Sequence, residues 1–420
     1  MYKDPICTLT REKPDMDGPE FVTGNIVRGD DLWDREEELQ KLITALEKSS
    51  VLLKAPRRYG KTSLMYKLYE EPPGGWTVFY LDAEGARSPE DFIATLGELA
   101  LGRLPAAKAK RWLTASLSAV LDRIEELSIA DFRIGLKEAV SQDWREQGES
   151  LVSVLAEFDS PVVFIVDEFP VLIANIKRHA GPDVAKDFLH WFRAIRHNSI
   201  LSAVRWLAAG SIAVETVVQR VGAGTEVIND FDIVTIGPFG DEVARSLIQA
   251  LVKTDRRLET PSDGLARFIV DAVGTGVPFF IQVLLKESVN LAVRRNLTGL
   301  SEEIVQEAYA ESVLGPANRT YFDHFYERLA RDFDPEKAHV AKRLILEVAR
   351  LETVSPDHLR RLFSQISKGR LDNTDWDEIM IYIENEYYVR LDPALVMYRF
   401  STNLLRDWWL RYHDQVEETA

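Results

Sequence analysis

The segment at residues 51–63 constrains the fold of this chain more than any other. It reads VLLKAPRRYGKTS: a short apolar run predicts a strand, and the residues after Gly60 predict the start of a helix. A strand that turns tightly into a helix leaves the first N–H groups of that helix without partners and aimed at one point. Such a helix N-terminus is a binding site for anions, and for phosphate groups above all. The segment therefore predicts a phosphate-binding loop in an α/β fold.

The residues of this loop follow the pattern Gly-x4-Gly-Lys-Ser/Thr, with Ala55 in place of the first glycine. Gly60 lets the backbone approach a phosphate, Lys61 supplies a charge for the β- and γ-phosphates, and Thr62 offers a hydroxyl to Mg²⁺. Ala55 weakens the match because alanine tolerates fewer backbone conformations than glycine. We predict that the nucleotide-binding loop consists of Ala55, Pro56, Arg57, Arg58, Tyr59, Gly60, Lys61, Thr62 and Ser63.

Two alternatives remain open for this loop. The whole segment could be a solvated basic turn that precedes a helix. Within a true phosphate-binding loop, Arg57 and Arg58 could contact the phosphates or merely flank them, and we favour flanking.

A second motif lies at residues 161–173, which read PVVFIVDEFPVLI. A continuous apolar run predicts a strand that is buried on both faces of a parallel sheet. This strand ends in two adjacent carboxylates, Asp167 and Glu168. We predict that Asp167 holds Mg²⁺ together with Thr62, and that Glu168 polarises the attacking water. The alternative is a core strand that ends in an acidic turn, which the phosphate-binding loop upstream disfavours.

The composition excludes several classes of protein. The formal net charge is −16, so the overall field of the chain does not attract it to DNA or to anionic membranes. The single cysteine excludes an intramolecular disulfide framework and fits a reducing compartment. There is no apolar run of 18 residues, no signal-peptide segment and no zinc-ligand spacing among the seven histidines. We expect a soluble, cytoplasmic protein without a membrane partner.

Segment patterns divide the chain into four expected parts. Residues 1–32 are rich in Pro, Gly and Asp and predict an extended arm. Residues 33–239 alternate strands with helices, which predicts a three-layer α/β core around a parallel sheet. Besides the two motif strands, strands are expected at 76–82, 132–140, 204–209 and 233–236. Helices are expected at 34–48, 89–104, 108–127, 150–157 and 183–197.

The remaining two parts are mainly helical. Residues 240–315 predict a helical lid, and residues 316–420 predict a winged-helix domain, because three helices followed by a hairpin are typical of that fold. The lid helices are expected at 241–253, 262–273, 278–293 and 301–312. In the last part, helices are expected at 336–351, 355–366, 374–385 and 403–413, and the hairpin at 387–401.

These motifs together resemble those of the STAND-type ATPases of the AAA+ superclass, especially the archaeal and bacterial ATPase group. The resemblance covers residues 20–412. Its most specific parts are APRRYGKTSL at 55–64, the strand that ends in Asp167 and Glu168, LWDREEEL at 32–39, and GVP at 276–278. It implies a P-loop (ASCE/AAA+-like) core, a helical lid and a winged helix, with ATP and Mg²⁺ as cofactors.

The resemblance also implies roles for four residues outside the two motifs. Arg35 would help to seat the adenine, although Asp34 replaces the glycine of that motif, and Pro278 would touch the base. Ser211 lies where a sensor residue would meet the γ-phosphate. Arg220 lies where an arginine finger would stabilise the transition state across a subunit interface, with a surface arginine as the alternative. Two weaker candidates for such a finger are expected on a solvated helix face, Arg193 and Arg196.

The third helix of the predicted winged-helix domain is acidic. A DNA-reading helix presents basic or amide side chains to bases and phosphates, whereas this helix has no basic residue. We therefore expect this domain to contact protein or to inhibit the core, and DNA is a disfavoured partner. The acidic residues of this helix are Asp372, Asp375, Asp377, Glu378, Glu384 and Glu386.

The sequence thus predicts an ATP-binding switch that hydrolyses ATP slowly, with Lys61, Glu168, Ser211 and Arg220 as its catalytic residues. We expect a partner protein of unknown identity and a homo-oligomer that depends on nucleotide. Two alternatives are a DNA-binding ATPase similar to replication initiators and a scaffold that binds nucleotide without hydrolysing it.

Overall fold

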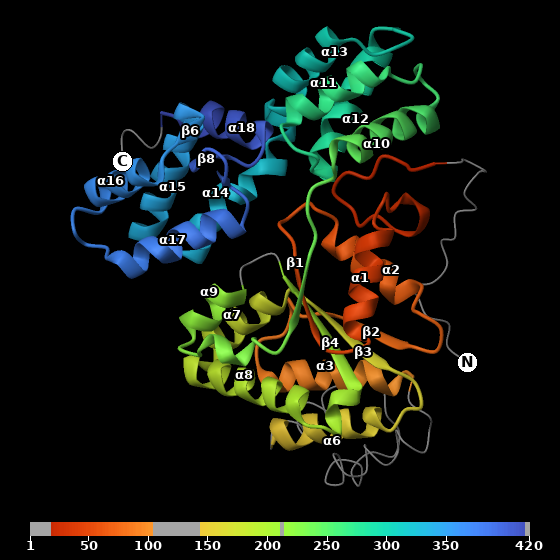
Figure 1. Ribbon diagram of the computed structural model, residues 1–420, viewed down its shortest axis with the longest axis vertical. Coiled ribbons are helices and arrows are strands. Elements are labelled where there is room, and N and C mark those ends of the chain that lie inside the picture. Colours follow the sequence, from red (N-terminus) through yellow and green to blue (C-terminus); the bar gives the residue numbers. More distant parts are fainter. Residues whose placement is uncertain (1–17, 104–142, 211–213, 416–420) are drawn as a thin grey trace. The chain divides into compact units, whose positions relative to one another are not determined.

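The computed structural model describes residues 18–103, 143–210 and 214–415, which group into two compact units (Figure 1). The larger unit comprises the described residues of 35–237 and 328–401 with those from 413 onward. The smaller unit comprises the described residues up to 34 together with 238–327 and 402–412. The predicted helix at 108–127 and strand at 132–140 lie outside the described residues.

Five parallel strands form the central sheet of the larger unit, in the order β2-β3-β4-β1-β5. Because parallel strands all end at the same edge, the carboxyl ends of β1 and β3 bring both sequence motifs to one edge of the sheet. The predicted three-layer fold is confirmed. The strands are β1 (Val51–Lys54), β2 (Thr77–Asp82), β3 (Val162–Asp167), β4 (Val204–Gly210) and β5 (Asp232–Thr235).

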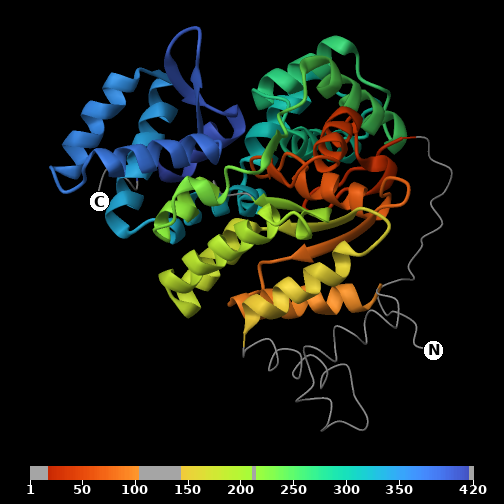
Figure 2. The ribbon, with the colours of Figure 1, turned by 60° about the horizontal axis from the view of Figure 1, so that its bottom comes forward.

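Helices cover both faces of this sheet. Helices α1 and α2 lie on one side and α7 and α8 on the other (Figures 1 and 2). Two of these helices, α3 and α6, begin at a side-chain cap; at the start of α3 the Ser88 hydroxyl accepts a hydrogen bond from Asp91 N. The helices are α1 (Glu36–Leu46), α2 (Lys61–Glu70), α3 (Pro89–Leu101), α6 (Trp144–Ala156), α7 (Phe169–Ala180), α8 (Pro182–His197) and α9 (Val214–Arg220).

The core of this unit explains why β3 is apolar throughout. All six residues of β3 are buried, because neighbouring strands flank it and helices cover both its faces. Aromatic rings fill the space beside it: the ring centroids of Phe164 and Trp206 are 5.1 Å apart, and those of Phe192 and Trp206 are 4.9 Å apart. This packing holds the end of β3, where the carboxylates lie, in a fixed place.

The strand predicted in the 161–173 segment ends at the carboxylates as expected, and the apolar residues after them begin a helix that was not predicted. Strand β3 ends at Asp167, and helix α7 begins at Phe169 with Pro170 in its first turn. Proline suits the first turn of a helix because no N–H is needed there. Gly210 at the end of β4 lies against this proline, and a Cβ atom at Gly210 would lie 2.2 Å from Pro170 Cδ. The break turns the chain sharply at Glu168.

A bundle of helices makes up most of the smaller unit. The four predicted lid helices are present, although the last one continues as a π-helical turn at Ala308–Val313. The N-terminal arm is tied to this bundle, because Lys286 Nζ donates to Thr23 Oγ1 at 2.8 Å. The helices are α10 (Asp241–Asp255), α11 (Asp263–Val273), α12 (Pro278–Arg294), α13 (Glu302–Glu307) and α18 (Asn403–His413).

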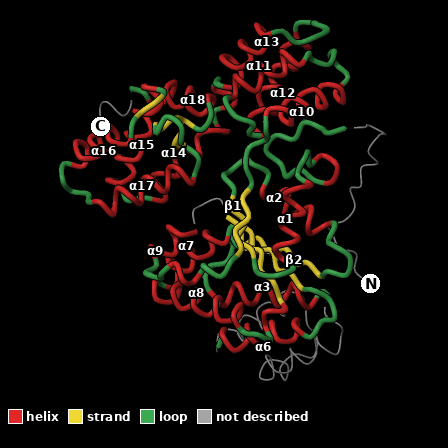
Figure 3. The backbone as a smooth tube through the Cα atoms, in the orientation of Figure 1, coloured by secondary structure: helices red, strands yellow, loops and turns green. Residues whose placement is uncertain are grey.

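Residues 328–401 of the larger unit form what we call the C-terminal module. Its three predicted helices and its hairpin are present, with the helices in red and the short strands in yellow in Figure 3. The hairpin strands join β6 in a small antiparallel sheet of order β6-β8-β7. Helix α14 (Thr320–Asp332), which was not predicted, contributes its last turns. The other elements are α15 (Pro335–Leu351), β6 (Thr353–Val354), α16 (Pro356–Ser367), α17 (Asn373–Asn385), β7 (Val389–Asp392) and β8 (Met397–Phe400).

Within the described ranges, every helix is too short or too polar to cross a lipid bilayer.

Candidate active site

The loop between β1 and α2 has the backbone that the sequence predicts at Gly60. This glycine has φ 89° and caps α2, and a left-handed conformation of this kind favours glycine. No protein atom lies within 4 Å of the place that a Cβ would take, so the space over Gly60 is open. Ala55 is buried and its φ is not positive, so the first position of the motif does not need glycine in this chain.

Lys61 lies at the base of the loop as a buried cation. Its side chain is only 7% exposed, and its Nζ makes no hydrogen bond. Two carboxylate oxygens, Asp167 Oδ1 and Glu168 Oε1, each lie 3.9 Å from that nitrogen, which is too far for a hydrogen bond. Burial lowers the pKa of Lys61, and the two carboxylates oppose this effect. A buried ammonium with unused donors fits an anionic ligand such as a phosphate.

Asp167 has several polar contacts at the end of β3. Its Oδ2 accepts a hydrogen bond from Tyr80 Oη at 2.8 Å and one from Thr62 Oγ1 at 3.3 Å, and its Oδ1 accepts from Glu168 N at 2.9 Å. Burial raises the pKa of this carboxyl, and Lys61 opposes that effect. A hydroxyl beside a carboxylate is a pair of oxygen ligands that suits Mg²⁺, so the residues present fit this ion.

Tyr80 also belongs to this site, although no sequence motif pointed to it. It lies on β2, which pairs with β3 so that Asp82 is in register with Asp167. The available signal was a hydroxyl-bearing ring between the apolar residues Phe79 and Leu81 of β2. Its contribution became visible only with the strand order, which places β2 beside β3.

Glu168 occupies an unusual backbone conformation. It has φ 54° and ψ 38°, and it forms the turn between β3 and α7. Residues other than glycine rarely adopt this left-handed conformation, and such strain is concentrated at functional sites. The turn leaves the Glu168 side chain 23% exposed, which is the partial access that a general base needs to reach a water molecule.

Arg35 ties the loop to the end of the core. It is 4% exposed, and its Nη2 donates to Tyr59 O at 3.2 Å and to Gly237 O at 3.0 Å. Its Nη1 forms an ion pair with Glu38 at 2.6 Å. These contacts give Arg35 a structural role at the loop, and its contact with an adenine base stays a prediction.

The other predicted site residues differ in how the structure places them. Ser211 lies outside the described residues, and Pro278 starts α12 in the smaller unit. Arg220, at the end of α9, forms an ion pair with Glu378 of the C-terminal module at 2.8 Å. Its guanidinium also lies 5.1 Å from the ring centroid of Phe333. The candidate arginine finger is thus engaged within the chain.

One arginine was wrongly assigned to a solvated helix face. Arg196 is 8% exposed, and its guanidinium pairs with Asp230, with Nε 2.7 Å from Oδ2. Two backbone carbonyls, those of Phe192 and Val227, accept its remaining hydrogen bonds. Arg196 therefore has a structural role in the core. The sequence offered no sign of this, because the carboxylate partner lies 34 residues away.

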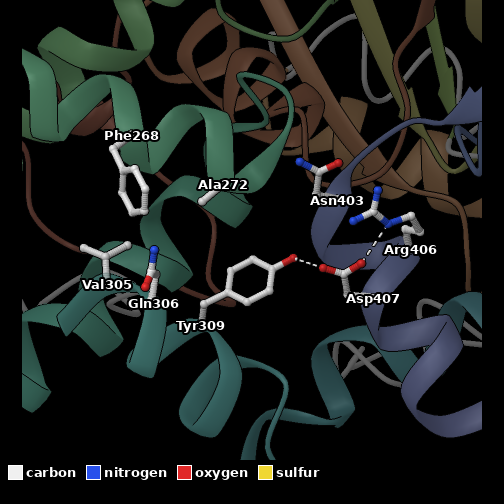
Figure 4. Close-up of a pocket in the computed structure, with 8 residues that line it drawn as sticks. All are labelled: Phe268, Ala272, Val305, Gln306, Tyr309, Asn403, Arg406 and Asp407. Atoms are coloured by element: carbon white, nitrogen blue, oxygen red, sulfur yellow. Dashed lines mark hydrogen bonds and ion pairs between the residues drawn. The ribbon is translucent and has the colours of Figure 1, made fainter. Parts of the chain in front are cut away.

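A separate cavity of about 220 Å³ lies in the smaller unit (Figure 4). Its walls come from α11, from α13 with the π-helical turn that follows it, and from α18. At its wall Tyr309 Oη donates to Asp407 at 2.6 Å, and Arg406 forms an ion pair with the same carboxylate at 2.7 Å. The cavity is smaller than the roughly 300–1,000 Å³ of typical ligand pockets. Because its carboxylate is already paired, this cavity is a weaker candidate than the loop at Lys61.

Comparisons with known proteins support the fold. No protein-family model matches the sequence, and no curated protein matches it either. Among solved structures, a Walker-type ATPase of Pyrococcus abyssi superimposes with a TM-score of 0.58 at 16% identity, covering 92% of this chain and 99% of that one. The chain has the fold of the AAA+ P-loop ATPases. The ORC2 protein of Aeropyrum pernix, solved as ADPNP–ADP complexes, has the same fold, with a TM-score of 0.54 at 13% identity and coverage of 92% and 94%.

Proposed function

We propose that this AAA+ chain binds Mg²⁺·ATP at the loop of residues 55–63 and hydrolyses it slowly, as a nucleotide-dependent switch. The observation that carries the proposal is the meeting of an unbonded buried ammonium, Lys61, with Thr62, Asp167 and Glu168 at one edge of the sheet. These groups come from two segments that are far apart in the sequence. Together they can bind an anion and a divalent cation and position a water molecule.

Each residue has a distinct part in the proposed reaction. The Lys61 ammonium and the N–H groups at the start of α2 bind the phosphates, and open space over Gly60 admits them. Thr62 and Asp167 would hold Mg²⁺, which neutralises charge on the phosphate oxygens. Glu168 orients a water molecule and takes its proton. In this proposal Ser211 and Arg220 assist at the γ-phosphate, Arg220 in a second copy of the chain.

ATP turnover measured over a wide range of protein concentrations tests this proposal. We expect slow turnover at every concentration. A specific activity that rises with concentration would support a site completed by Arg220 of a second copy. A constant specific activity would support a switch that works as a monomer. Tight nucleotide binding without any turnover would contradict the proposed hydrolysis. It would favour the alternative of a scaffold that binds nucleotide without hydrolysing it.

The hydroxyl of Tyr80 is expected to support Mg²⁺ binding. Tyr80→Phe removes the hydrogen bond to Asp167, and loss of such a supporting contact typically lowers metal affinity about tenfold. The Mg²⁺ concentration that gives half-maximal ATP turnover should rise accordingly. Tyr69→Phe is the control, since it removes a hydroxyl from a ring 6.0 Å away. Equal Mg²⁺ dependence in both variants would show that the Tyr80 hydroxyl has no such role.

The C-terminal module is proposed to be a winged helix that regulates the core by contact. Glu378 of α17 forms ion pairs with Arg220 at 2.8 Å and with Lys337 at 2.7 Å. The module therefore holds Arg220, the candidate arginine finger. An arginine held in this way is not available to a second copy. Release of the module by nucleotide or by a partner protein would free it.

A second candidate function is that of a DNA-binding ATPase similar to replication initiators, and one observation favours it. Three of the six acidic residues at 372–386 pair with cations within the chain: Lys337 pairs with both Asp375 and Glu378, and Arg328 pairs with Glu386. The helix therefore repels phosphate less than its composition suggests. The ORC2 protein of Aeropyrum pernix shares this fold. Titration with duplex DNA at several salt concentrations tests this function. Binding whose affinity falls steeply as salt rises would support it, because contacts with DNA phosphates depend on salt in this way.

A further inference from the structure

Glu386 and Arg328 form an ion pair that is almost completely buried. Glu386 follows the last residue of α17 and is 1% exposed, whereas Arg328 in α14 is 3% exposed. Their charged groups lie 2.7 Å apart, between Arg328 Nη1 and Glu386 Oε2. Burying two charges is costly, and such a pair often stabilises a fold no better than apolar residues of the same size. Such a buried pair therefore points to a role other than stabilising the fold.

The pair lies beside the phosphate-binding loop. Tyr387, the residue after Glu386, meets Tyr59 of the loop edge-on, with ring centroids 5.1 Å apart. Arg57 of the same loop has a buried Nε that makes no hydrogen bond. Burial and the nearby Arg328 lower the pKa of Arg57, and the carboxylates of Glu168 and Glu386 oppose this. Glu386 thus belongs to the same cluster of charges as the loop.

The charges of this cluster balance without a nucleotide. Its cations are Lys61, Arg57, Arg328 and Arg331, and its anions are Asp167, Glu168, Glu386 and Asp332. A bound Mg²⁺·ATP adds net negative charge, which destabilises each carboxylate of the cluster. In the proposed reaction Asp167 and Glu168 are required for the ion and the water. Glu386 has no part in that chemistry, and it lies in the C-terminal module, which packs in the same compact unit as the core.

We propose that Glu386 competes with the terminal phosphate of ATP for the positive charge of Arg57, so that the C-terminal module seated on the loop opposes ATP binding. This inference rests on the proposed function, because it requires ATP at the loop. Glu168 marks the γ-phosphate end of the site and shares Arg57 with Glu386. The competition should therefore oppose ATP more than ADP. Arg57 is then a phosphate contact whose partner changes with the nucleotide state.

The test is the affinity of the full chain for ATP and ADP, measured with Mg²⁺ by displacement of a fluorescent ADP. Glu386→Gln removes the competing charge at nearly constant volume. We expect it to tighten ATP binding on the order of tenfold, a typical size for coupling between sites, and ADP binding clearly less. Glu384→Gln is the matched control: it changes the same residue type two positions earlier, in the last turn of α17, and Glu384 accepts a hydrogen bond from Tyr398 at 2.7 Å within the module. Glu384→Gln should leave both affinities unchanged.

Three outcomes would overturn the inference. Equal ATP affinity in the wild type and in Glu386→Gln would show that Glu386 does not compete with ATP. The proposed function would remain intact. An equal gain for ATP and ADP would remove its link to the terminal phosphate. No nucleotide binding by any variant would overturn the proposed function and this inference together.

A second variant covers the case in which Glu386→Gln does not fold. Glu378→Arg reverses the charge at the contact with Arg220, where the side chain is 20% exposed. It weakens the seating of the module without touching the loop. We expect tighter ATP binding here as well. An unchanged ATP affinity in a folded Glu378→Arg chain would contradict the idea that the seated module opposes ATP.

Discussion

Glu168→Gln is expected to abolish ATP turnover while ATP still binds. Glutamine keeps the size of the side chain and can still contact the water, but it cannot take its proton. Loss of a general base typically costs about 10²–10⁴-fold in rate. Binding should persist, because the groups proposed to hold the phosphates and the metal are Lys61, Thr62 and Asp167. The measurements are phosphate release at saturating ATP and, separately, the dissociation constant for ATP.

The control for this prediction is Glu84→Gln, which makes the same change at an exposed residue just after β2. It should leave turnover at the wild-type rate. If Glu168→Gln hydrolysed ATP as fast as Glu84→Gln, Glu168 would not be the base. A joint loss of binding and turnover would instead show that Glu168 mainly holds the site together, through its charge beside Lys61.

The fold near the two motifs could be predicted because its signals are local. The strands at β1 and β3 are continuous apolar runs, and Gly60 and Lys61 mark the start of α2 within a few residues. Two local signals were nevertheless missed. The apolar run continues past Glu168 into α7, so only Pro170 indicated the change from strand to helix. Helix α14 is rich in aromatic residues, which are weaker helix formers than Leu or Ala.

The candidate site was predictable only as far as its motifs. Asp167 and Glu168 were assigned from the strand that precedes them, whereas the hydroxyl of Tyr80 needed the strand order. The contacts of the C-terminal module were out of reach, because Arg220 and Glu378 are 158 residues apart. For the same reason, counting the acidic residues of α17 overestimated its free negative charge. Sequence reveals which charges a helix carries, but their partners depend on tertiary packing.

Lys61→Met is expected to abolish nucleotide binding without weakening the fold. Methionine keeps much of the volume of lysine and removes the buried ammonium at the base of the loop. Charge-assisted hydrogen bonds to phosphate are worth about 1.5–3 kcal/mol each, so affinity should fall at least about a hundredfold. Lys67→Met on the same helix is the control, since Lys67 pairs with Glu71 near the surface. It should bind ATP as the wild type does.

The effect of Lys61→Met on stability separates a binding role from a structural one. The pKa of Lys61 is lowered in the folded chain, so the unfolded chain binds more protons between the lowered and the ordinary pKa. Stability therefore rises with pH in that window, and at pH 7 the charged lysine costs stability when no ligand is present. Removing that charge should leave the melting temperature of the nucleotide-free chain equal or higher, and it should remove the rise toward alkaline pH. A melting temperature lowered by more than about 5 °C would mean that Lys61 supports the fold by its charge near Asp167 and Glu168. In that case the ammonium would be a structural ion rather than one held in readiness for phosphate.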